Sequence, residues 1–303
     1  MSLGKVARAV AVLAVSALAF SGCGGGEEQA AEKGGQPITV ASFNFTDSVI
    51  IAQAYASALE SAGYPVTRKM DLGAREVVYP AMEKGELQLL PEYLGSALSS
   101  GFGIDPPTDP EKATSQLSGQ FSKKGFTVLP YAEAQNNNEL VTTKQLAGQR
   151  GLKTYSDLAK LDKVVLAAPP ECRERDTCLK GLKDIYGLDN VEMRSVQEAA
   201  PRLEQLKSGD VNLIRLFSTQ PILADDGLTT LKDDKTMLPP ENVLPVISSD
   251  VLKKRGKELQ NTIDAVTEKL TTKELLELNR RVEQDGEDPA DVAKDWLEAR
   301  NIS

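Results

Sequence analysis

Short strand-like segments alternate with helix-length segments from Pro37 onward, and this alternation constrains the fold more than any other feature of the chain. Residues 37–43 alternate and are β-branched, which predicts a strand. A helix is expected from about Ser48 to Ser61, with Thr46 or Asp47 accepting from its free N–H groups. Strands at 65–70 and 86–90 and a helix at 75–84 complete the unit. A strand–helix–strand–helix–strand order predicts an α/β fold with a parallel sheet.

The same alternation resumes after the two prolines at 106–107. Helices are expected at 111–123 and from 156, and the tail from 250 to 301 is helical by pattern. Strands are expected at 127–129, 139–142, 164–167, 211–217, 228–231 and 242–247. Two α/β blocks joined by two crossings predict two domains on a two-strand hinge: lobe 1 at 37–139 plus 246–303, and lobe 2 at 140–245. Ligands of such sheets bind beyond the carboxyl ends of the strands, between lobes.

The first 36 residues indicate export and a membrane anchor. Residues 1–22 combine two basic residues, a short apolar run and small residues before Cys23, as a signal peptide does. Cys23 is the expected lipid-attachment site, and the glycine-rich polar stretch 23–36 is the expected flexible tether. The alternative is an ordinary signal peptide that happens to contain a cysteine. Either way, the body is expected outside the cell membrane, in an extracellular or periplasmic location.

Composition excludes several functions. The net charge is −9, and loss of the leader with its two basic residues would make it −11, so nucleic acid is not an expected partner. The chain has no histidine, which removes Ser-His-Asp and Cys-His catalysis and leaves a poor set of metal ligands. We expect no enzyme activity, catalytic residue, metal or cofactor; a carboxylate-pair glycosidase is the distant alternative. In an exported protein, Cys172 and Cys178 are expected to form a disulfide.

Several long motifs resemble one family. Residues 72–86 (LGAREVVYPAMEKGE) and 91–98 (PEYLGSAL) are similar to the substrate-binding proteins of osmoprotectant ABC importers, which take up glycine betaine, choline and carnitine. Four shorter stretches agree in order, at 42–47, 169–172, 181–188 and 216–219. The likeness covers about residues 37–300. It implies a type II periplasmic-binding-protein fold, a small quaternary-ammonium ligand held between the lobes, an ABC permease as partner, and a monomer.

The resemblance also implies an aromatic cage around the ligand's ammonium group, since a trimethylammonium cannot donate hydrogen bonds. Tyr93 matches one cage tyrosine, and Phe217 stands at the place of another. Asn138 and Leu203 stand where rings are expected, so Phe43, Phe45 or Tyr131 would have to complete the cage. The alternative is a different small zwitterion, such as an amino acid.

The remaining candidate ligand residues are polar. Arg175 matches an arginine that can clamp a carboxylate, although it could be a surface residue of the charged run 173–176. Arg75 could point into the cleft or pair with Glu76 and its neighbours. Asn44 could donate to the ligand or form a turn. Asn136 and Thr219 complete the expected set.

Overall fold

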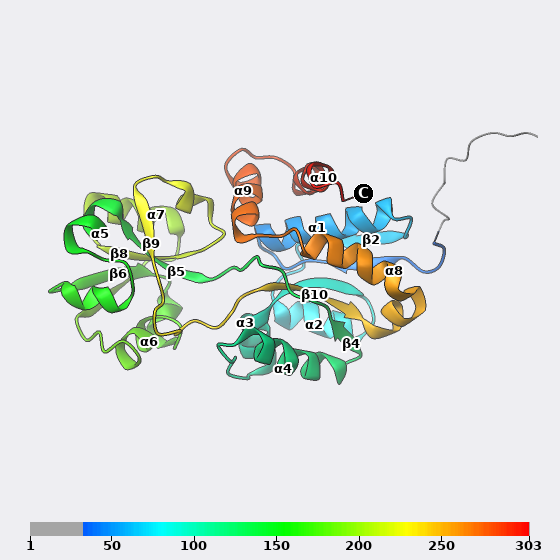
Figure 1. Cartoon of the computed structure of the whole chain (residues 1–303), viewed down its shortest axis with the longest axis horizontal. Helices are drawn as coiled ribbons and strands as arrows, with labels where there is room; N and C mark the ends of the chain where they lie inside the picture. Colours follow the sequence, from blue (N-terminus) through cyan, green and yellow to red (C-terminus); the bar gives the residue numbers. More distant parts are fainter. Residues whose placement is uncertain (1–32, 303) are drawn as a thin grey trace, which may run out of the picture. The chain divides into compact units, whose positions relative to one another are not determined.

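The computed structural model describes residues 33–302 of the 303-residue chain (Figure 1). The expected signal peptide, the lipid-attachment site Cys23 and most of the expected tether lie outside the described residues. No helix between residues 33 and 302 has both the length and the apolar character that crossing a membrane requires.

The first sheet has five strands in the order β2-β1-β3-β10-β4. The strands β1, β2 and β3 run parallel, whereas β10 pairs antiparallel with both β3 and β4. Their bounds are Ile38–Ala41 for β1, Val66–Lys69 for β2, Leu89–Tyr93 for β3, Phe126–Val128 for β4 and Val243–Ser248 for β10. The predicted parallel unit is therefore present, and a late strand of the chain returns to complete it.

Helices cover both faces of this sheet (Figure 1). The long first helix and the C-terminal helices lie on one face: α1 (Thr46–Ser61), α8 (Ser249–Thr267), α9 (Thr272–Glu283) and α10 (Pro289–Ala299). On the other lie α2 (Arg75–Glu83), α3 (Leu94–Ser96), the π-helical turn η1 (Ala97–Gly101) and α4 (Pro110–Ser122). Tyr55 and Trp296 are buried in this core, so the helical tail packs against the first sheet.

The second sheet has the order β7-β6-β8-β5-β9. Its strands are β5 (Asn138–Thr143), β6 (Val164–Ala168), β7 (Val191–Ser195), β8 (Leu213–Phe217) and β9 (Leu228–Leu231). Its helices are α5 (Lys144–Arg150), η2 (Ser156–Lys160), η3 (Pro170–Glu174), α6 (Leu179–Asp184), α7 (Ala199–Ser208) and η4 (Pro221–Ala224). The predicted disulfide is present between Cys172 and Cys178, and it ties η3 to the start of α6.

Two segments join the sheets, one between β4 and β5 and the other between β9 and β10 (Figure 1). They pair with each other through an isolated antiparallel bridge between Gln135 and Asn242. The backbone N–H of Asn136 also donates to the carbonyl of Glu241 at 3.1 Å. The two crossings that the sequence predicted therefore lie side by side.

Three local features differ from the expectations. The third strand begins at Leu89 rather than at residue 86, and it includes Pro91, which lies opposite Pro245 of β10. The strand β7 and the helices α3, α5 and α7 were not predicted. The helix α1 begins at Thr46, so Phe45 occupies the N-cap position and its side chain makes no capping hydrogen bond.

Candidate functional site

A cavity of about 550 Å³ contains most of the predicted ligand residues. Seven of the nine line it: Asn44, Phe45, Arg75, Tyr93, Asn136, Phe217 and Thr219. The other lining residues are Thr46, Asp47, Ser96, Gln220, Glu241, Asn279 and Glu283. The lining residues come from the end of β1 and the start of α1, from α2, β3 and α3, from the end of β8, from both joining segments and from α9. The cavity therefore draws on both sheets.

Aromatic rings form one wall of the cavity. The rings of Phe45 and Tyr93 lie 5.5 Å apart at 50°, and Phe43 stacks behind Phe45 with its centroid at 5.7 Å. Phe43 is buried, whereas Phe45 and Phe217 are 38% and 37% exposed. Exposing aromatic faces to water in a concave site costs free energy. The same faces attract a cationic ligand. Phe45 was one of the three residues expected to complete the cage, with Phe43 and Tyr131, and it lines the cavity.

Two buried carboxylates face the same space. Asp47, in the first turn of α1, accepts a hydrogen bond from Asn136 Nδ2 at 3.0 Å. Burial raises the pKa of Asp47 to about 6, and nearby Glu283 acts in the same direction. Glu241 accepts from the backbone N–H of Ser96 at 3.0 Å and from its hydroxyl at 2.9 Å. Burial nevertheless raises the pKa of Glu241 to about 7. A bound cation would favour the ionised form of both groups.

Arg75 lines the cavity, but its donors are already engaged. Its Nε and Nη2 each donate to the buried carboxylate of Glu92 at 2.7 Å, and the Tyr79 hydroxyl donates to the same carboxylate at 2.6 Å. The guanidinium carbon also lies 5.0 Å from the centroid of the Phe43 ring. The partner is therefore Glu92 rather than Glu76. A bidentate pair of this kind leaves Arg75 little capacity to clamp a ligand carboxylate.

Three cavity residues carry buried polar atoms without a partner. Within residues 33–302, the Tyr93 hydroxyl, Asn136 Oδ1 and Asn279 Oδ1 make no hydrogen bond. Burial raises the pKa of the Tyr93 phenol, and the nearby carboxylate of Asp47 raises it further, although the two groups lie outside hydrogen-bond geometry. Unpaired buried polar groups are costly, so they point to a ligand or to water as the missing partner.

The other predicted residues lie elsewhere. Asn138 and Arg175 line a neighbouring cavity of about 630 Å³, which shares Ser96 and Glu241 with the first one. Arg175 is exposed at the end of η3. Leu203 packs into a small core of the second sheet, and Tyr131 donates to Glu111 at 2.9 Å. Neither lines the ligand cavity.

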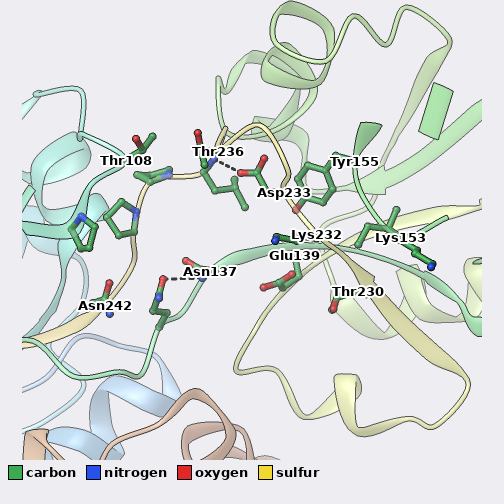
Figure 2. A pocket seen from close by; sticks show the side chains of 16 residues that line it. Thr108, Asn137, Glu139, Lys153, Tyr155, Thr230, Lys232, Asp233, Thr236 and Asn242 are labelled. Carbon is green, nitrogen blue, oxygen red and sulfur yellow. Dashed lines mark hydrogen bonds between the residues drawn. The ribbon is translucent and has the colours of Figure 1, made fainter. Parts of the chain in front are cut away.

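A third cavity, of about 600 Å³, lies against the joining segments. Figure 2 shows Glu139 of β5 and Tyr155, which precedes η2, lining it together with Asn137 and Asn242 from the two segments. Burial and the neighbouring Asp233 raise the pKa of Glu139 to about 7. Tyr155 is the only aromatic residue among those that line this third cavity. The third cavity therefore cannot enclose an ammonium group between rings, as the first cavity can.

Sequence reasoning missed seven residues of the ligand cavity. Thr46 and Asp47 were noted only as helix caps, and five others were not noted as ligand residues: Ser96, Gln220, Glu241, Asn279 and Glu283. Glu241 follows two prolines in the segment that joins β9 to β10, and these prolines restrict the backbone just before it. Asn279 gives no such signal, because it lies inside an amphipathic helix beside the buried Leu278.

Comparison with known proteins accounts for this arrangement. A family model described as the substrate-binding domain of an ABC-type glycine betaine transport system matches residues 36–299. The chain belongs to this family. The family's role is extracytoplasmic ligand binding for ABC importers, in agreement with the resemblance noted in the sequence.

Two curated relatives and one solved structure support the assignment. The glycine-betaine-binding protein of Pseudomonas aeruginosa is 27% identical over 85% of this chain and 86% of its own length. The carnitine transport binding protein OpuCC of Listeria monocytogenes is 25% identical over 87% of each chain. A crystal structure described as a glycine betaine/carnitine/choline ABC transporter shares 26% identity and a TM-score of 0.80, over 88% of this chain and 99% of that one. The fold is that of a type II periplasmic binding protein, as predicted.

Proposed function

We propose that this protein binds a quaternary-ammonium osmoprotectant such as glycine betaine, carnitine or choline in the 550 Å³ cavity and delivers it to an ABC permease. The observation that carries the proposal is the pairing of the Phe45 and Tyr93 rings with two buried carboxylates, Asp47 and Glu241. Aromatic faces and carboxylates are the groups that attract a cation without hydrogen-bond donors. Asn44, Asn136, Phe217 and Thr219 complete the proposed ligand set.

The direct test is calorimetry on the purified protein with glycine betaine, carnitine and choline. Saturable heat with at least one of the three supports the proposal. No heat with any of them at millimolar concentration overturns it. A thermal-shift measurement gives a second readout, since a ligand that binds only the folded state raises the Tm by mass action.

A different small zwitterion, such as an amino acid, is the second candidate. The absence of a ring at Asn138, which lies outside the cavity, and at Leu203 favours it, because fewer rings make a weaker cage for trimethylammonium. A thermal-shift screen over amino acids and methylated amines separates the two candidates. A Tm increase with an amino acid and none with the methylated amines would favour the second.

We further propose that the protein works as a lipid-anchored monomer, held at the membrane through Cys23, with lobes 37–139 plus 246–303 and 140–245 closing about the two joining segments. Tethering would keep the receptor at a high effective concentration near its permease. Metabolic labelling with palmitate should mark the wild-type protein and not Cys23→Ser. Equal labelling of both would remove Cys23 from the proposal.

A further inference from the structure

The first of the two joining segments presents different side chains on its two faces. Asn136 lines the ligand cavity, and Asn138 lines the neighbouring one. The residues that alternate with them line the third cavity: Gln135, Asn137 and Glu139. Side chains along an extended backbone point to opposite faces in turn. The third cavity and the ligand cavity therefore lie on opposite faces of this segment.

The second joining segment shows the same alternation. Pro240 and Asn242 line the third cavity, whereas Glu241 between them lines the ligand cavity. The bridge between Gln135 and Asn242 pairs the two segments into one ribbon. Within residues 33–302, the ligand cavity and the third cavity share no lining residue. We call the side of the ribbon that lines the third cavity its back face.

Both α/β units contribute to the third cavity, as they do to the ligand cavity. Thr108 and Pro110 come from the start of α4 in the first unit, whereas Tyr155 and Lys232 come from the second. Figure 2 shows Thr108 and Tyr155 at opposite ends of the cavity. A rotation about the ribbon brings the units together on one face and moves them apart on the other. Closing of the ligand cavity would therefore widen the third cavity.

Two residues of the second unit can change the filling of the third cavity. Lys232 and Thr230 line it with exposed side chains, so larger side chains there would not disturb a core. Their backbone is held firmly. The N–H of Lys232 donates to the Lys153 carbonyl at 2.9 Å, and Thr230 of β9 pairs with Val141 of β5. Bulk at either position would therefore act against the first unit across the cavity.

We propose that the width of the third cavity sets the balance between open and closed molecules, so that side chains on the back face control the affinity for every ligand without contacting it. This inference rests on the proposed function, because it requires the two units to close about the ribbon. Bulk on the back face opposes opening of the ligand cavity and does not hinder its closing. A ligand that needs the closed state then binds more tightly, because closing costs less free energy.

The test compares two substitutions of Lys232. Lys232→Trp adds bulk, and Lys232→Met removes the charge at nearly constant length. Lys232→Trp should lower the Kd of each ligand that the wild type binds by about threefold to tenfold, and by the same factor for each. Lys232→Met should match the wild type. Calorimetry with glycine betaine, carnitine and choline gives the measurement. Thr230→Trp repeats the test at a second position and replaces Lys232→Trp should that variant not fold.

X-ray scattering of the unliganded variants gives a readout that needs no ligand. The radius of gyration should be smaller for Lys232→Trp than for Lys232→Met, because a closed molecule is more compact. The control is Arg194→Trp, on the exposed edge strand β7, which lines neither cavity and should match the wild type in both measurements.

Unchanged affinity and unchanged radius of gyration in both tryptophan variants would overturn the inference. Weaker binding, or tighter binding of one ligand alone, would overturn it as well, because the first indicates disturbed packing and the second a direct contact. Absence of binding of all three compounds to the wild type overturns the proposed function instead. The scattering comparison then decides the inference by itself.

Discussion

The two sheets bring opposite chemistry to the cleft. Around the first, the cavity is aromatic and acidic, with Asp47 and Glu241 buried beside Phe45 and Tyr93. The second α/β unit brings the exposed Arg175 to the neighbouring cavity, whereas Arg215 of β8 and Arg202 of α7 are buried and line neither cavity. The first α/β unit neutralises its own arginine, Arg75 of α2, through Glu92, whereas within residues 33–302 neither Arg202 nor Arg215 forms a salt bridge. Two structurally similar α/β units therefore present different side chains to the same cleft.

Loss of the disulfide should have the largest effect on stability, and it should affect the second region and not the first. Replacing Cys172 and Cys178 together by serine should lower the free energy of unfolding by about 2 kcal/mol, because the bridge closes only a short loop. The structure around η3 and α6 should loosen, while the first sheet stays protected. Hydrogen exchange measured by mass spectrometry checks this. Equal loss of protection in both sheets would show that they unfold as one unit.

The aromatic wall of the first region should dominate affinity. Tyr93→Ala should weaken binding of a quaternary ammonium by about tenfold, which corresponds to roughly 1.4 kcal/mol and to the loss of one good cation–π contact. Calorimetry on the variant gives the measurement, and Tyr131→Ala, outside the cavity, is the control. An unchanged affinity in Tyr93→Ala would remove this ring from the ligand site.

Affinity for a quaternary ammonium should fall as the pH decreases from 8 to 5. The pKa values of Asp47 and Glu241, about 6 and about 7, place their protonation in this window, and each protonation removes a charge that attracts the ligand. We expect a loss of roughly threefold to tenfold by calorimetry at several pH values. Asp47→Asn should flatten the lower part of this profile. A flat wild-type profile would mean that neither carboxylate faces the ammonium.

The smallest effect concerns stability without ligand. The pKa of Asp47 is higher in the folded protein than its ordinary value of 3.8. Its contribution to stability is therefore fully present below about pH 4 and is lost as the pH rises through about 6. Asp47→Asn should raise the Tm of the unliganded protein by roughly 2–4 °C at pH 8, and by much less at pH 4. Thermal melts of the two proteins check this. A lower Tm for the variant at pH 8 would contradict it.

The helices and strands that have a clear local sequence pattern were predicted. Those whose position depends on tertiary contacts were missed or misplaced. The helix at α1 and the strands β1, β2, β6 and β9 follow from alternation and from flanking glycines. The third strand shifted because Pro91 and Glu92 do not look like strand residues. Pro91 is tolerated opposite Pro245, and the buried Glu92 is compensated by Arg75 and Tyr79. None of these partners is adjacent in sequence.

The candidate site was predictable where a motif carried it. Tyr93, Phe217 and Thr219 stand in stretches that resemble the family, and all three line the cavity. The buried state of Arg215, behind Phe217, was not predictable, because an arginine inside a strand pattern gives no hint that it is buried. Its burial depends on the pairing of β8 with β5 and on packing by α7, which brings Arg202 to the Arg215 carbonyl.

The hydrogen bond from Asn279 Nδ2 to the Thr219 carbonyl, 2.9 Å long, joins α9 to the end of β8. It connects the two regions without passing through either joining segment. A bond of this kind contributes about 1 kcal/mol, enough to change the ratio of two conformations by roughly fivefold. The measured affinity for any ligand is then the product of two terms, the fit of the cavity and the fraction of molecules already in the binding-competent state. Loss of this hydrogen bond should therefore change the affinity for every ligand by the same factor, whereas loss of the Asn279 side chain from the cavity lining would affect each ligand separately.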